Sequence, residues 1–165
     1  MTNVLHCDAV SADALAGLLS TYGLELQWIE TGQSIPGTHF GDPEAGLIAN
    51  NLYVRGDTPL HSLLHEACHY ICMDDGRRQH LHTDAGGDYD EENAVCYLSI
   101  LLADSIPGYS HAQMMGDMDN WGYTFRLGNA RRWFEEDAED ARDWLQLSGI
   151  ISKDETPTGI LKTDR

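Results

Sequence analysis

The chain has 165 residues, of which 42% are hydrophobic and 22% charged, and its formal net charge at pH 7 is −17. A chain of this length can bury the core of one domain, and the composition is that of a globular protein. The acidic charge argues against nucleic acid and anionic membrane surfaces as partners, because both would repel it. We therefore expect no nucleic-acid and no membrane partner.

The cysteines and the first residues give expectations about the compartment. Cys7, Cys68, Cys72 and Cys96 show no regular short spacing, and the middle two lie four apart in an expected helix, where a disulfide is disfavoured. Buried free thiols in a reducing compartment are the simpler interpretation. Residues 1–19 lack the basic and apolar segments of a secretion signal, and no apolar run approaches the ~20 residues that span a bilayer. We expect a cytoplasmic protein.

The first third of the chain has patterns typical of one helix and two strands. Ser11 is a suitable N-cap and Gly23 a suitable helix stop. Alternating apolar and polar residues then predict a half-buried strand. The expected elements are a helix over 11–22, a strand over 24–30, a loop over 31–43 and a second strand over 46–54. An exposed edge on the second strand would suit an extended peptide substrate.

A capped, amphipathic helix is predicted next. Thr58 can cap its free N–H groups, Pro59 fits the first helical position, and the helix should end at 74–76. Within it, His65, Glu66 and His69 spell H-E-x-x-H. Leu60, Leu63, Leu64, Ala67 and Ile71 form the stripe that we expect to face the core.

The spacing of this motif indicates a metal site. Residues four apart lie on one helix face, so His65 and His69 can bind one ion while Glu66 reaches a water on that ion. Zinc suits imidazole nitrogen and lowers the pKa of its bound water towards ~7. Glu66 would then act as general base while the water attacks a carbonyl. The alternative is an amphipathic helix with histidines on its polar edge.

The rest of the chain is predicted to be helical. We expect a connection over 77–87, a helix over 90–104, a weaker helix over 110–118, a helix over 129–145 with an acidic solvated face, and a loose tail over 152–165. Residues 1–151 would form a single zincin-like metallopeptidase domain of the α+β class. It would be mainly helical, with a small antiparallel or mixed sheet packed on the motif helix.

From Leu47 to Asp104 the chain resembles the ImmA/IrrE-type metallopeptidases, a group of minimal zincins. That family carries H-E-x-x-H on one helix and E-x-x-A-N-x-F-A-x-x-L-L-M-P on the next, which resembles the run Glu91–Asp104 here. Val95 stands where asparagine is usual, and Ala103-Asp104 replaces Met-Pro. The resemblance implies a zinc peptidase that cleaves a protein or peptide, with Glu91 as third zinc ligand.

The choice between two adjacent carboxylates, Glu91 and Glu92, also follows from the faces of their helix. Neighbouring helical residues point about 100° apart, so only one can face the motif helix. The face of Glu91 continues through apolar residues and that of Glu92 through smaller, mixed ones, which favours Glu91 and leaves Glu92 as runner-up. Asp88 and Glu91 could instead form a capping box. His80 or His82 is an alternative third ligand.

Two questions stay open at this stage. The candidates for a donor to the oxyanion are Tyr53, His61, His80, His82 and Tyr89, and for His61 a solvent-facing position near the helix start is the simpler interpretation. A non-catalytic metal-binding or regulatory scaffold protein is the main alternative to a peptidase. The retained Glu66 argues against it, because a scaffold needs ligands but no base. The sequence indicates no oligomeric state.

Overall fold

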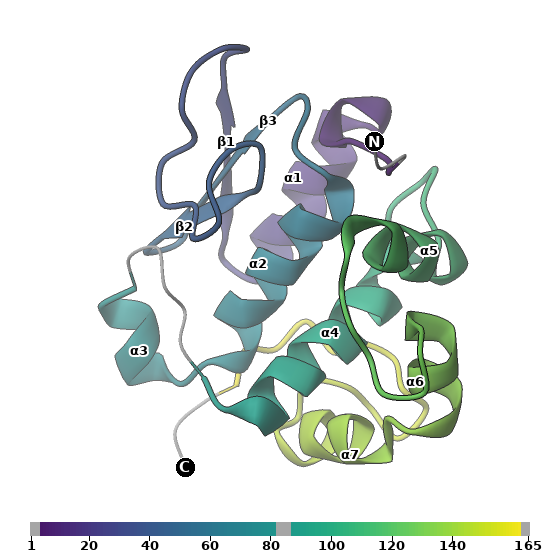
Figure 1. Ribbon diagram of the computed structural model, residues 1–165. Coiled ribbons are helices and arrows are strands. Elements are labelled where there is room, and N and C mark those ends of the chain that lie inside the picture. The colour runs from purple at the N-terminus through teal and green to yellow at the C-terminus, as the bar shows by residue number, and fades with distance from the viewer. Residues whose placement is uncertain (1–3, 82–86, 163–165) are drawn as a thin grey trace.

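A small sheet and a set of helices make up residues 4–81 and 87–162, the part that the computed structural model describes (Figure 1). The strands are β1 (Glu25–Ile29), β2 (Gly46–Ile48) and β3 (Asn51–Arg55). The helices are α1 (Ala12–Thr21), α2 (Leu60–Cys72), α3 (Asp75–Gln79), α4 (Tyr89–Ala103), α5 (His111–Trp121), α6 (Ala130–Glu136) and α7 (Glu139–Leu147), with a 3-10 turn at Cys7–Ala9. The prediction of an α+β fold is confirmed.

The sheet is mixed, with the strand order β1-β3-β2. β1 runs parallel to β3 and β2 runs antiparallel to it. The single strand predicted over 46–54 is wrong: it is a hairpin that turns at Ala49 and Asn50, with Ala49 at a φ of 53°. β3, the strand before the motif helix, is therefore the central strand, paired with β1 along its length and with β2 over Asn51–Tyr53, so it is not the exposed edge strand that was expected. The outer edge of β2 bonds to the preceding loop, through Leu47 N–H and the carbonyl of Gly37.

Helix α2 lies between the sheet and α4 (Figure 1). Its predicted apolar stripe is buried as expected, and this burial fixes which face carries the motif. The predicted capping role of Thr58 is wrong, because its hydroxyl accepts a hydrogen bond from Arg55 N–H at 2.8 Å. The start of α2 is instead tied to the N-terminal segment, where Leu60 N–H donates to the carbonyl of Leu5.

Two predictions for later helices need correction. The single helix expected over 129–145 is divided into α6 and α7, and Asp137 at the break pairs with Arg126 at 2.7 Å. The connection expected over 77–87 begins with residues that belong to α3. The side chain of Asp74 caps the N-terminus of this short helix. The helix expected over 110–118 is present as α5 and runs three residues further.

The segment after Ile151 is held against the body of the protein, so the expectation of a loose tail is wrong for residues 152–162. Lys162 N–H donates to the carbonyl of Ile71 at 3.0 Å, and the buried guanidinium of Arg78 donates to the carbonyl of Lys162. The hydroxyl of Tyr97 donates to Glu155. The segment therefore bridges α2, α3 and α4.

All four cysteines are buried free thiols, as predicted. Within the described ranges, none of the helices is long and apolar enough to cross a bilayer.

Candidate metal centre

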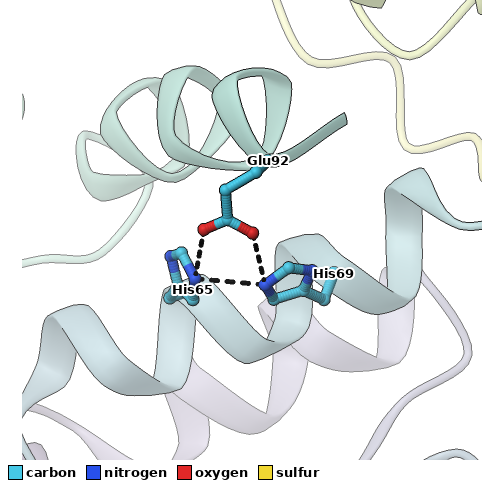
Figure 2. A group of neighbouring side chains, drawn as sticks. All are labelled: His65, His69 and Glu92. Atoms are coloured by element: carbon cyan, nitrogen blue, oxygen red, sulfur yellow. Dashed lines mark hydrogen bonds and ion pairs between the residues drawn. The ribbon is translucent and has the colours of Figure 1, made fainter. Parts of the chain in front are cut away.

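Three side chains from two helices converge on one point. His65 and His69 project from the same face of α2, and Glu92 reaches down to them from the first turn of α4 (Figure 2). The two Nε2 atoms are 3.1 Å apart, and the Glu92 oxygens lie 3.0 Å from His65 Nε2 and 3.1 Å from His69 Nε2. These donor atoms all lie within 4.8 Å of one another, close enough to share one metal ion.

The chemistry of this set suits a divalent cation. Two imidazole nitrogens that face each other at 3.1 Å repel unless a proton or a cation lies between them. Burial opposes ionisation of Glu92, yet the hydrogen bonds from His65 and His69 outweigh it and hold the pKa of Glu92 well below its ordinary value. For His69, burial favours the neutral form, but Glu92 outweighs it and raises the pKa. The cluster thus stabilises positive charge at its centre.

The outer ring nitrogens fit the same arrangement. His65 and His69 are 9% and 8% exposed, and among the described residues their Nδ1 atoms have no hydrogen-bond partner. If a metal took the place of the protons on the two Nε2 atoms, each Nδ1 would carry the ring proton. The residues present therefore fit a metal bound through Nε2, although the usual partner that orients such a ring through Nδ1 is missing within the described part of the chain.

Glu91, which sequence analysis favoured as third ligand, does not lie at this point. Its carboxylate forms two hydrogen bonds of 2.7 Å with the guanidinium of Arg77, and its side chain is buried away from the histidines. Asp88 caps α4 by accepting from Glu91 N–H at 2.8 Å, which is one half of the capping box considered as an alternative; the Glu91 carboxylate, which would form the other half, binds Arg77. The preference is corrected in favour of the runner-up, Glu92.

The reason lies in how α4 is buried. The argument for Glu91 assumed one apolar face directed at α2, but α4 also packs on α5 and α7, so it is apolar on nearly all sides. The face towards α2 is the one with smaller residues: the hydroxyl of Ser99 is 3.4 Å from the carbonyl of Leu64. Small side chains let the two helices approach closely, which brings Glu92 within reach of the imidazoles.

Glu66 and two of the metal-site side chains, His65 and Glu92, line a cavity of about 350 Å³. Glu66 is 8% exposed, and burial, the largest influence, raises its pKa. A raised pKa suits a carboxylate that must take and return a proton. The cavity is lined by His65, Glu66, Glu92, Glu44, Phe40, Ser62 and the segment Trp121, Gly122 and Tyr123.

Sequence analysis missed Tyr123 as a functional candidate. Gly122 ends α5 with a φ of 109° and returns the chain towards the cavity, where the Tyr123 ring stands 5.7 Å from that of His65. Burial raises the pKa of Tyr123 well above 10, so its hydroxyl keeps its proton and can donate. No local pattern marks this residue. The only signal is an aromatic pair around a helix-ending glycine, Trp121-Gly122-Tyr123.

His61 supports Tyr123 rather than facing solvent, so that expectation is wrong. Its ring is fully buried between Trp121 and Tyr123, and its Nδ1 is 3.3 Å from the Tyr123 hydroxyl. Burial lowers the pKa of His61 to about 3, which keeps the ring neutral.

The other donor candidates lie outside the lining of this cavity. Tyr53 is on β3, His80 is exposed at the end of α3, and Tyr89 is 70% exposed at the start of α4. His82 falls outside the described residues, so its predicted roles as third ligand or oxyanion donor stay predictions. The described residues that group around a possible ion do not include His80.

Comparisons with protein-family models, with curated proteins and with solved structures find no match to this chain. Functional inference therefore rests on the site itself.

Proposed function

We propose that the chain is a zinc-dependent metallopeptidase that hydrolyses peptide bonds with Glu66 as general base. The observation that carries the proposal is the convergence of His65, His69 and Glu92 beside a cavity that Glu66 also lines. Two imidazoles and one carboxylate form a common ligand set of catalytic zinc, which keeps one position open for water or substrate.

Zinc would be held by the Nε2 atoms of the two histidines and by the Glu92 carboxylate. When bound, it would polarise a carbonyl and lower the pKa of water towards ~7. Glu66 supplies the proton movements: its carboxylate takes the proton of the attacking water and returns it to the leaving amine. Only 8% of Glu66 is exposed, so solvent has little direct access to its carboxylate.

Tyr123 is the residue that we assign to the oxyanion. A phenol that stays protonated and lines the cavity can donate a hydrogen bond to the oxygen that gains charge. His61 positions that hydroxyl. Because its Nε2 has no partner among the described residues, the ring is better satisfied with its proton on Nδ1, donating to the Tyr123 oxygen. The phenol proton then remains free for the substrate.

The relation to ImmA/IrrE-type peptidases forms part of the proposal and changes in one respect. With Glu92 as ligand, the alignment of α4 shifts by one residue, so Ala94 and the pair Leu101-Leu102 lose their match to the family pattern. The resemblance then rests on H-E-x-x-H and on an acidic start of the next helix.

Metal analysis and a peptide library test the proposal together. Protein purified without chelator should hold about one zinc per chain. The zinc-loaded wild type should cleave members of a proteome-derived peptide library, as detected by mass spectrometry. Glu66→Gln should keep the zinc and lose roughly 10²–10⁴-fold in rate. Tyr123→Phe, which removes one hydroxyl, should also keep the zinc and lower kcat.

The outcomes separate the two functional classes. Equal zinc content with no cleavage by wild type or by Glu66→Gln would refute the peptidase and support the metal-binding scaffold. Absence of zinc after dialysis against the metal would refute both.

A further inference from the structure

One wall of the cavity carries an acidic group that the proposed reaction does not use. Glu44 lies half-buried in the loop between β1 and β2 and lines the cavity together with Glu66 and Glu92. Glu92 completes the metal site and Glu66 serves the proton transfer, so the carboxylate of Glu44 is surplus to both.

The loop holds Glu44 in a fixed place. Next to it, Ala45 N–H donates to the hydroxyl of Ser62 in the first turn of α2 at 3.0 Å. A methyl group on Gly46 would lie 1.8 Å from the carbonyl of Pro36, so the middle of the loop packs tightly against the start of β2. Glu44 therefore stands on a rigid wall and loses little freedom when a ligand binds.

The surroundings of Glu44 do not neutralise it with a strong base. The groups that act on its carboxyl are Glu66, which has the same charge, the imidazoles of His65 and His39, and the side chain of Trp121. The arginine ion pairs within residues 4–81 and 87–162 join other acids. A partly buried carboxylate is costly without a cationic partner.

Aromatic rings complete the same wall. Phe40 is 70% exposed at the cavity, and Trp121 and Tyr123 line it further in. Aromatic faces attract guanidinium and ammonium groups, and a carboxylate beside them supplies the opposite charge. The net charge of −17 also raises the local concentration of cationic ligands.

We propose that Glu44, with Phe40 and Trp121, forms a subsite for a cationic group of the substrate, adjacent to the metal centre. The group is a guanidinium or an ammonium, supplied either by a basic side chain or by a free amino terminus. The role of this subsite in substrate specificity rests on the proposed peptidase function, whereas the binding of a cation to it does not.

The test uses binding to metal-free full-length protein, measured by calorimetry or NMR titration at about 0.15 M salt. Nα-acetyl-arginine amide is compared with Nα-acetyl-citrulline amide, its neutral counterpart. Leucine amide, with a free amino terminus, is compared with Nα-acetyl-leucine amide. We expect about a tenfold preference for the cationic member of at least one pair. The first pair identifies a side chain as the source and the second an amino terminus.

Glu44→Gln should abolish that preference. Glu30→Gln is the matched control, because it makes the same change of charge at an exposed residue just after β1. No preference in the wild type, or a preference that survives Glu44→Gln, overturns the subsite even if peptides are cleaved. A preference that depends on Glu44 in a protein without peptidase activity upholds the subsite and refutes only the proposed function.

Discussion

The same substitution at the adjacent residues Glu91 and Glu92 should affect different properties of the protein, stability at one and zinc affinity at the other. Glu92→Gln removes the carboxylate that faces His65 and His69, whereas Glu91→Gln removes the carboxylate that is bound to Arg77. Both variants change one charge in the same helical turn, so each is the control for the other. We expect Glu92→Gln to lose zinc affinity and Glu91→Gln to lose stability.

The magnitudes follow from the contacts. Structural zinc sites contribute ~10–16 kcal/mol through four ligands, so one ligand is worth about 2.5–4 kcal/mol, or roughly 10²–10³-fold in affinity. Glu91 makes two charge-assisted hydrogen bonds of 2.7 Å with a guanidinium that is one-third exposed. Discounted for that exposure, their loss should cost about 1–2 kcal/mol of unfolding free energy.

Two assays separate these effects. Competition with a chromophoric chelator gives the zinc affinity, and urea unfolding of the metal-free protein gives the stability. Glu91→Gln should bind zinc within about tenfold of wild type, the low end of the usual loss for an outer residue, because its carboxylate bonds to Arg77 and not to a proposed ligand. If Glu91→Gln loses the metal while Glu92→Gln retains it, the assignment of the third ligand is wrong. If both retain it, His80 or His82 becomes the better candidate.

Three further predictions concern stability. Gly46→Ala places a methyl group 1.8 Å from the Pro36 carbonyl and should lower the unfolding free energy by ~3 kcal/mol or more. Gly17→Ala has open space around it in α1 and should leave the unfolding free energy unchanged or raise it by ~0.5–1 kcal/mol, so equal melting temperatures for the two variants would contradict this reasoning. Because burial lowers the pKa of His61 to about 3, the unfolded chain binds a proton that the folded chain does not between pH 6.5 and 3. Stability should therefore fall with decreasing pH by about 1.4 kcal/mol per unit in that window, and His61→Gln should show about 2 kcal/mol less loss between pH 7 and 5 in urea unfolding; an identical pH dependence would rule this out. Truncation after Ile151 leaves the buried guanidinium of Arg78 without the Lys162 carbonyl and should lower the unfolding free energy by about 2 kcal/mol or more. An unchanged midpoint of urea unfolding would show that the segment is loose.

Local patterns sufficed where one short-range rule dominates. The apolar stripe of α2 predicted its buried face, and Ser11 caps α1 by accepting from Ala14 N–H as expected. The same kind of pattern failed where two rules compete. Ile48 and Leu52 continue an apolar alternation, but the intervening Ala49-Asn50 turns the chain into a hairpin.

The candidate site was predictable in part for the same reason. His65, Glu66 and His69 share one helical segment, so their spacing alone brings them together. Tyr123 and Glu44 reach the cavity through tertiary contacts, one after the end of α5 and the other from a loop tied to Ser62. Nothing in their sequence neighbours indicates the cavity, since the contacts that place them involve residues far away in the chain.

Residues before α4 determine that Glu91 binds Arg77 while Glu92 faces the histidines. Gly87, at a φ of 102°, has no side chain, and a Cβ there would lie 2.2 Å from a Glu91 carboxylate oxygen. The guanidinium of Arg77, in the last turn of α3, holds that carboxylate, and Asp88 caps the first turn of α4. These contacts fix the rotation of α4 about its axis, and the residue about 100° further round is Glu92. In a helix that is apolar on nearly all sides, the neighbouring arginine, rather than the apolar pattern, thus determines which of two adjacent carboxylates faces the histidines.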